Sequence, residues 1–133
     1  MPIVYRSVRV VLQNSTDDVM TVEGTEVLLG TWSAGLGLKN GESLDRQSAR
    51  AIATESTVLQ RGTEAYARLG SVNGYLNVHW HLPWIGDFRC DATCSSPLRQ
   101  VDVQVNEDEP AAIAVLVTVT QEGTSPSAVP PGS

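Results

Sequence analysis

Residues 75–88 read YLNVHWHLPWIGDF, and this stretch decides the fold. Every second residue from Leu76 to Leu82 is apolar, and a period of two is typical of a strand that buries one face. Pro83 cannot continue the strand, because it has no backbone N–H to donate. We therefore predict a strand over 75–82 with Trp80 facing the core, followed by a loop.

The segment around Pro83 is rich in aromatic residues. Two of the chain's three tryptophans and its only phenylalanine fall within residues 79–88. Trp84 has left the strand, so its ring is expected at a sheet edge or a loop tip, where it either plugs the core or is displayed to a partner. Tryptophan suits a membrane–water boundary because it combines an apolar body with a polar N–H.

Short apolar segments recur on both sides of this stretch, separated by polar turns. Val72-Asn73-Gly74 predicts a hairpin turn by its Asn-Gly pair, and Gly24 marks a bulge within its strand. The alternation of alanines with polar residues favours a strand over 46–55, although alanine also permits a helix. The other strands are predicted at residues 3–13, 19–29, 65–69, 99–105 and 111–121.

Seven or so short strands without a convincing helix predict an all-β, single-domain antiparallel β-sandwich over residues 1–121. The first two strands are expected to pair as an antiparallel hairpin across the polar turn at 14–18. The glycine-rich segment 30–41 is predicted to be irregular, with Trp32 near a strand end or on a loop. The tail at 122–133, rich in proline, serine and glycine, is predicted to be disordered.

Charge and hydropathy exclude several classes of partner. The net charge is −6, and the nine basic residues are scattered singly, so no cluster is available for a nucleic acid or for purely electrostatic binding to anionic lipid. The N-terminal residues lack the apolar core of a signal peptide, and no segment approaches the roughly 20 apolar residues of a spanning helix. We expect a protein that is made in soluble form, without a signal peptide.

Residues suited to catalysis or metal binding are few. His79 and His81 lie two residues apart on one strand face, where Asp87, Cys90 or Cys94 could add ligands, but the spacing is not that of a zinc site and two solvent-facing histidines are the better interpretation. No Gly-x-Ser-x-Gly elbow or glycine-rich phosphate loop occurs. We predict no enzyme activity, no metal and no cofactor, and a disulfide between the two cysteines stays open.

Several short motifs occur in order over residues 6–121. They are Val8-Arg9-Val10 with Asn14-Ser15-Thr16, Gly30-Thr31-Trp32, Glu55-Ser56 followed after five residues by Gly62-Thr63-Glu64, and Trp80-His81-Leu82-Pro83-Trp84-Ile85-Gly86. In this order they resemble the aegerolysins, and most closely the branch with the fourteen-kilodalton component of bacterial binary insecticidal crystal proteins. The chain departs from that branch at His81-Leu82, where Asp-Asn is usual, and at Asp87-Phe88-Arg89, which replaces a glycine-rich turn.

The resemblance implies a small acidic β-sandwich of aegerolysin or actinoporin-like fold that binds membrane lipid. It implies membrane contact by Trp32, Trp80 and Trp84, and Phe88 and His81 of the same aromatic segment are added as candidates. Because alternation places Trp80 inward, the role is assigned first to Trp84 and then to Trp32. The implied partners are a sphingolipid-type lipid or a target-cell receptor, and a larger pore-forming protein. A homo-oligomer stays open.

The expected function is that of a non-enzymatic, pore-forming toxin component of insecticidal type. It would act outside the producing cell, on target-cell membranes, alone or with the larger partner. The alternative is a carbohydrate- or protein-binding β-sandwich without pore-forming activity. A metal-dependent enzyme built on His79 and His81 is a third interpretation, which a stoichiometric metal in the purified protein would indicate.

Overall fold

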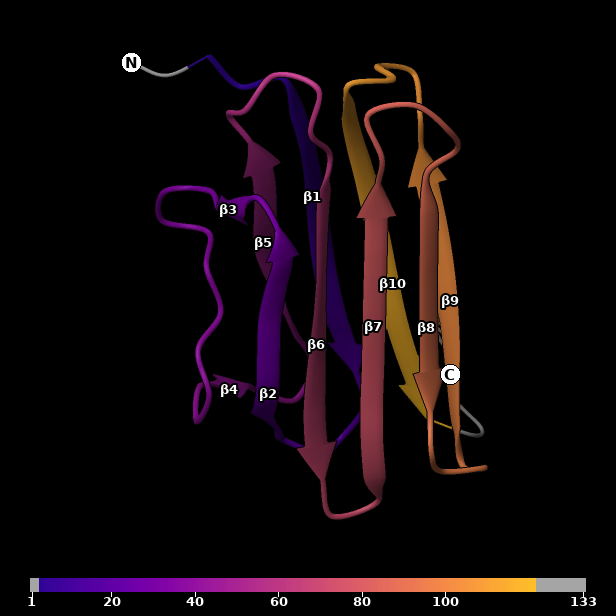
Figure 1. The fold of residues 1–133 in the computed structure, drawn as a ribbon. Helices are drawn as coiled ribbons and strands as arrows, with labels where there is room; N and C mark the ends of the chain where they lie inside the picture. Colours follow the sequence, from indigo (N-terminus) through magenta and orange to yellow (C-terminus); the bar gives the residue numbers. More distant parts are fainter. Residues whose placement is uncertain (1–2, 122–133) are drawn as a thin grey trace.

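The computed structural model describes residues 3–121, and within that range it contains strands and loops but no helix (Figure 1). No helix in the described range is therefore long and apolar enough to cross a membrane. The predicted all-β sandwich is confirmed, while the tail predicted at 122–133 lies outside the described residues. The strands are β1 (Arg6–Ser15), β2 (Met20–Leu29), β3 (Thr31–Trp32), β4 (Ser43–Leu44), β5 (Ser48–Ser56), β6 (Thr63–Ser71), β7 (Gly74–Leu82), β8 (Arg89–Cys94), β9 (Arg99–Asn106) and β10 (Ala112–Gln121).

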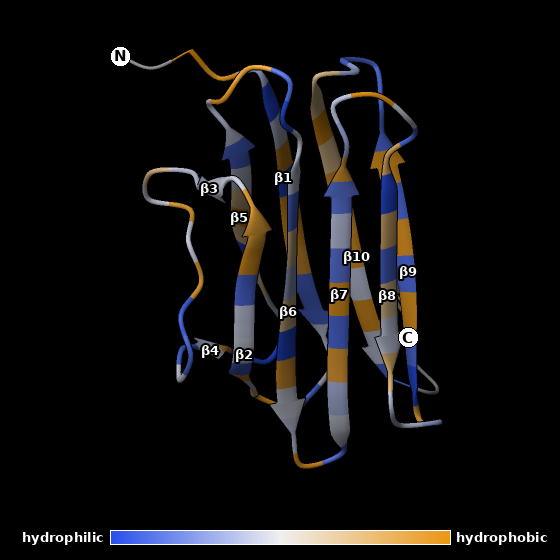
Figure 2. Ribbon diagram, viewed as in Figure 1, coloured by the Kyte–Doolittle hydropathy of each residue, from blue (hydrophilic) through white to orange (hydrophobic). Residues whose placement is uncertain are grey.

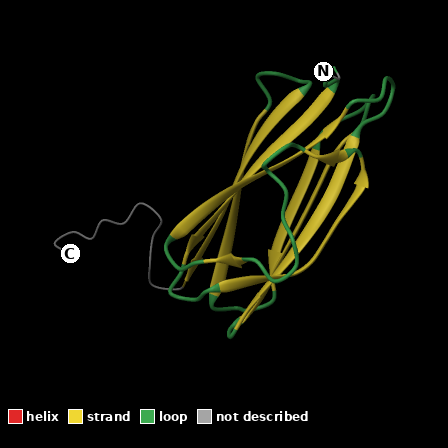
Figure 3. Ribbon diagram, turned by 90° about the vertical axis from the view of Figure 1, so that its left-hand side faces the viewer, coloured by secondary structure: helices red, strands yellow, loops and turns green. Residues whose placement is uncertain are grey.

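Two five-stranded sheets face each other, and Figure 3 shows them as separate layers. The first sheet has the order β3-β5-β1-β10-β9, and the second has the order β4-β2-β6-β7-β8. All pairs are antiparallel except β1 with β10, which run parallel. The sandwich is therefore mostly, not wholly, antiparallel. Alternation within a strand fixes which face is buried and carries no information on strand direction.

The first two strands do not form the predicted hairpin, because β1 and β2 belong to different sheets. The polar turn between them makes a corner instead. Asn14 is fully buried there, and its Nδ2 donates to the carbonyl oxygens of Asp18 at 2.7 Å and Asp45 at 3.0 Å. These hydrogen bonds from Asn14 hold the chain where it crosses from one sheet to the other. Asparagine, serine, threonine and aspartate also favour tight turns, which is why the sequence predicted a hairpin here.

Other sequence predictions of local structure are confirmed. The register of β2 against β6 shifts between Val22 and Gly24, which is the expected bulge. The ambiguous stretch 46–55 forms strand β5, and the Asn-Gly turn joins β6 to β7. In β7 the side chains of Leu76, Val78, Trp80 and Leu82 are buried, as the alternation predicts.

Strand β8 was not among the predicted strands. Its inward residues are Cys90, Ala92 and Cys94, which pack at the margin of the core. Four residues of strand span about 13 Å, whereas a disulfide needs Cα atoms about 4.4–6.8 Å apart. Both cysteines are free, and strand geometry excludes the disulfide that the sequence left open.

The core lies between the sheets and is built from alternate residues of both. Valine, leucine and isoleucine dominate it, and Trp80 is its largest fully buried side chain. The strands run between two ends of the sandwich. We call the end at which β1 and β10 begin and β7 finishes the Trp84 end, at the top of Figure 1, and the other the opposite end.

Candidate functional site

The loop after β7 holds Trp84 in a fixed environment at the Trp84 end. The guanidinium carbon of Arg6 lies 4.0 Å from the centroid of the indole, and the Nη2 of Arg6 donates to the carbonyl oxygen of Trp84 at 3.1 Å. Tyr5 meets the indole edge-on, with ring centroids 6.1 Å apart. Trp84 is on a loop, as predicted. Its side chain is half-buried, because Arg6 of the same chain covers one face of the ring.

The next residue, Ile85, is the side chain that the loop presents to solvent. It is 86% exposed, and Gly86 follows with φ of +120°. Because a side chain is strained at that φ, glycine is favoured at the turn that displays Ile85. Sequence reasoning missed Ile85 because a single apolar residue in a loop has no periodicity. Its position between a tryptophan and a glycine was the available signal.

Further exposed apolar residues gather at the same end. They come from the chain before β1, the end of β2 and the loops after β5 and β7, which Figure 2 shows as apolar segments. Exposed apolar side chains that share one end of a fold are candidates for an interaction site. We call this surface the apolar rim, which consists of Ile3, Val4, Leu28, Val58, Leu59 and Ile85.

Trp80 is fully buried and takes part in a polar network that joins the two sheets. Its Nε1 donates to the hydroxyl of Thr54 in β5 at 3.0 Å, and that hydroxyl lies 2.9 Å from the hydroxyl of Thr63 in β6. The Thr63 hydroxyl lies 3.0 Å from the carbonyl oxygen of Leu29. Each hydroxyl has one hydrogen to donate. All three hydrogen bonds form when Trp80 donates to Thr54, Thr54 donates to Thr63, and Thr63 donates to the carbonyl oxygen of Leu29. The structure thus gives Trp80 a packing role, and its ring is not accessible to a lipid.

Trp32 and Phe88 also pack on the core. Trp32 is half-buried, with its ring centroid 6.3 Å from that of Trp80. Phe88 is half-buried beside a recess of about 240 Å³ that Leu82, Asp87 and Glu107 help to line. The structure therefore places both rings at the Trp84 end, where they pack against the core and are only partly exposed to solvent.

His81 lies on the outer face of the second sheet, half-buried, between Glu64 of β6 and Arg89 of β8. Its neighbour on the same face, His79, has its Nε2 2.7 Å from a carboxylate oxygen of Glu64. Among the described residues no group of three or more histidine, cysteine, aspartate or glutamate side chains is placed to hold a metal ion.

The two cysteines point into the sandwich, away from both histidines. Burial, with the nearby charge of Asp91, raises the pKa of Cys90 to about 11, and burial also raises the pKa of Cys94. A reactive cysteine needs a lowered pKa. The arrangement therefore lacks the thiolate that a Cys–His catalytic pair requires.

The charges at the Trp84 end are unevenly distributed. The acidic turn 107–109 joins β9 to β10 at this end, whereas Asp17 and Asp18 lie at the opposite end. On the other side, a recess of about 390 Å³ includes Glu55, Val58 and Arg61 in its lining. The Glu55 carboxylate accepts a 2.6 Å hydrogen bond from the Ser33 hydroxyl.

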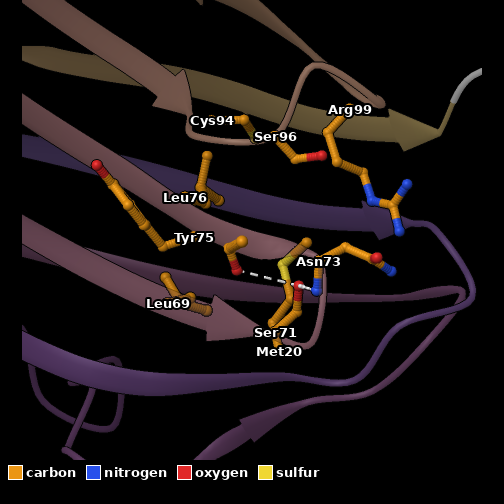
Figure 4. A pocket seen from close by; sticks show the side chains of 10 residues that line it. Met20, Leu69, Ser71, Asn73, Tyr75, Leu76, Cys94, Ser96 and Arg99 are labelled. Carbon is orange, nitrogen blue, oxygen red and sulfur yellow. Dashed lines mark hydrogen bonds between the residues drawn. The ribbon is translucent and has the colours of Figure 1, made fainter.

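A recess at the opposite end is too small for a ligand. Figure 4 shows its lining, which includes Met20, Asn73 and Arg99. Its volume is about 10 Å³, which is room for about one water molecule. The Trp84 end holds the apolar rim, the candidate aromatic residues and a recess large enough for a small chemical group.

No protein-family model matches the chain, and no curated protein is detectably similar to it in sequence. Solved structures are similar in fold. The RahU protein, solved in complex with a TRIS molecule, has a TM-score of 0.73 at 12% identity, covering 91% of this chain and 98% of RahU. The lipid-binding protein Nakanori has a TM-score of 0.71 at 13% identity, covering 87% of this chain and 71% of Nakanori. The fold is thus an aegerolysin-like β-sandwich.

Proposed function

We propose that this chain is a non-enzymatic lipid-binding protein that docks on membranes through the Trp84 end. The observation that carries the proposal is the apolar rim, with Ile85 86% exposed at the tip of a loop. Apolar and aromatic side chains at one end of a rigid sandwich can enter the headgroup layer while the strands stay in water. The shared fold with a lipid-binding protein supports this use of the rim.

The acidic turn 107–109 refines this docking geometry. This turn is at the same end as Trp84. Carboxylates are costly to remove from water. The molecule is therefore expected to tilt towards the side of β1, β2 and β5, so that the apolar rim, with Ile85 nearest the acidic turn, enters the headgroup layer and the acidic turn stays in water.

From the resemblance to the aegerolysins we propose a more specific role. The chain would be a pore-forming toxin component of insecticidal type, which recognises a sphingolipid-type lipid or a receptor on target cells. It would act extracellularly, alone or with a larger pore-forming protein. The absence of enzyme activity is part of this proposal, and the raised pKa values of the two thiols support it.

Vesicle binding tests the proposal. Wild type, Trp84→Ala, Ile85→Asp and Val72→Asp are compared by flotation with sphingomyelin–cholesterol vesicles and with vesicles of the phosphoethanolamine analogue of sphingomyelin. Val72 is the matched control, because it is 91% exposed in the β6–β7 turn at the opposite end. We expect Ile85→Asp to weaken binding at least tenfold, since a carboxylate replaces an apolar side chain that docking would bury, and Val72→Asp to leave it unchanged.

Trp84→Ala is expected to weaken binding by a smaller factor, because one face of the indole is already covered by Arg6. Circular dichroism and thermal melts of each variant separate loss of binding from loss of fold. If the wild type binds vesicles and both Ile85→Asp and Trp84→Ala bind them equally well, this mode of docking is overturned. Binding on a glycan array without any vesicle binding would favour the carbohydrate-binding alternative.

A further inference from the structure

Five of the eight arginines form no ion pair with a carboxylate of residues 3–121, and three of these five lie at the Trp84 end. Three of the eight form ion pairs, namely Arg50 with Glu42, Arg68 with Glu23 and Arg99 with Asp18, and all three lie in the half of the sandwich away from the Trp84 end. At the Trp84 end, Arg6, Arg61 and Arg89 form no ion pair with a carboxylate of residues 3–121. An acidic chain thus leaves three unpaired cations beside the apolar rim, while Arg9 on β1 and Arg46 at the opposite end are its other unpaired arginines.

Arg6 is fixed in position with donors to spare. Its Nη1 donates to the carbonyl oxygen of Tyr5 at 2.9 Å and its Nη2 to that of Trp84 at 3.1 Å, while its plane lies over the indole. A guanidinium has five N–H donors, so these contacts leave it able to bind an anion. Because the side chain is already ordered, little further conformational entropy is lost on binding.

Arg61, in the neighbouring loop between β5 and β6, helps to line the recess of about 390 Å³. The recess is also lined by Thr31, Thr57 and Glu55, and it opens to solvent next to Val58 of the apolar rim. Arg6 pairs through its backbone with Ser56 of β5, which lines the recess too, so Arg6 lies on the strand next to the recess. Each cation is therefore beside side chains that the proposed docking would place in the headgroup layer.

We infer that Arg6 and Arg61 bind the phosphate group of a phospholipid headgroup. This inference rests on the proposed docking through the Trp84 end. The planar guanidinium fork matches a phosphate in two parallel hydrogen bonds, and the phosphates of phospholipids lie in the headgroup layer that the rim would enter. Glu55 in the recess and the acidic turn 107–109 disfavour added negative charge, so the chemistry fits a zwitterionic phospholipid better than an anionic one.

The test compares bilayers with and without phosphate. Wild type, Arg61→Gln, Arg6→Gln, Arg6→Lys and Arg46→Gln are floated with phosphatidylcholine vesicles, with vesicles that add phosphatidylglycerol, and with vesicles of digalactosyl diacylglycerol, which has no phosphate. Arg46 is the control, because it is an exposed arginine at the opposite end without an ion pair in residues 3–121. Titration with soluble glycerophosphocholine, followed by tryptophan fluorescence, separates a lipid phosphate from a free one.

We expect Arg61→Gln and Arg6→Gln each to weaken binding to phosphatidylcholine about tenfold, the size of one charge-assisted interaction, with Arg6→Lys between wild type and Arg6→Gln. Binding to galactolipid should be weaker in wild type and unchanged in Arg61→Gln. The phosphate role would be overturned if the wild type bound phosphatidylcholine and galactolipid vesicles with equal affinity. It would also be overturned if the arginine variants lost the same factor in affinity for both lipids, and rim docking would be left intact in either case. Binding to no vesicle would overturn both, and tight binding of soluble glycerophosphocholine alone would replace the lipid by a free phosphoester.

Discussion

At Trp80 the two lines of sequence reasoning gave different roles, and packing decides between them. Alternation along residues 75–82 predicted an inward ring, whereas the resemblance implied membrane contact. The ring is fully buried, and its N–H is bonded to Thr54 of the facing sheet. A large side chain with one polar atom is retained in a core when that atom has a partner. Conservation of such a tryptophan within a fold would follow from packing alone.

Replacing Thr54 by valine removes the acceptor of that bond at nearly constant volume. The indole N–H of Trp80 would then be buried without a partner, and we expect a loss of about 2 kcal/mol in the free energy of unfolding. Chemical denaturation followed by tryptophan fluorescence measures the change. Thr93→Val, at an exposed position on the outer face of β8, is the control, with an expected change below about 0.5 kcal/mol. Equal effects of the two substitutions would contradict the network.

At the scale of elements, sequence patterns located strands best where the buried residues are valine, leucine or isoleucine. Strand β8 escaped because its inward residues are two cysteines and an alanine, whose contrast with polar neighbours is weak. The pairing of strands was less predictable, since the turn at 14–18 uses the same residue types for a corner between sheets as for a hairpin. Partner choice depends on contacts between segments far apart in sequence.

The candidate site shows the same limit. The loop with Trp84 was predicted from Pro83 and the end of alternation. The apolar rim was not, because its members come from four separate segments that meet only in the folded chain. The unpaired state of Arg6 and Arg61 is likewise a property of the fold, since a sequence does not state which carboxylate lies beside which cation.

The thiols of β8 provide a prediction at this scale. With the pKa of Cys90 raised to about 11 from 9.0, the thiolate fraction at pH 8 is about a hundredfold smaller than in the unfolded chain. Ellman's reagent should therefore react with Cys90 of the folded protein at least about a hundredfold more slowly than with the same protein in guanidinium chloride. Peptide mapping should find no bond between Cys90 and Cys94. Rapid reaction of both thiols, or an intramolecular disulfide, would show that β8 is not paired as described.

At the scale of the whole molecule, one ion pair ties three connections together at the opposite end. Arg99 at the start of β9 pairs with Asp18 of the β1–β2 corner, and the amide of Asn73 in the β6–β7 turn donates to the same carboxylate at 2.9 Å. The hydrogen bond from Asn73 and then that from Arg99 lower the pKa of Asp18 below its usual value. The β1–β2 corner, the β6–β7 turn and the start of β9 are therefore coupled through the carboxylate of Asp18.

Linkage fixes the sign of the resulting pH dependence. A carboxyl with a lowered pKa in the folded state stabilises the fold fully above its unfolded pKa, and this contribution is lost as the pH falls through the folded pKa. We expect Asp18→Asn to cost about 1–2 kcal/mol at pH 6.5, with the difference from wild type shrinking below about pH 4. Urea midpoints across this range provide the measurement. Asp108→Asn, on the exposed turn, should show no such trend, and a difference that is constant with pH would remove Asp18 from this role.

The parallel pairing of β1 with β10 has a consequence for biosynthesis. The two strands are central neighbours in one sheet, yet about a hundred residues separate them in the chain. During synthesis, the second sheet can form as soon as β8 has left the ribosome, because its paired strands are mostly close in sequence. The facing sheet has β1 and β5 by then, but the apolar face of the second sheet is fully covered only after residues 112–121 have been made. A stalled nascent chain is thus expected to need a chaperone at this stage, and closure of the sandwich follows synthesis of its tenth strand.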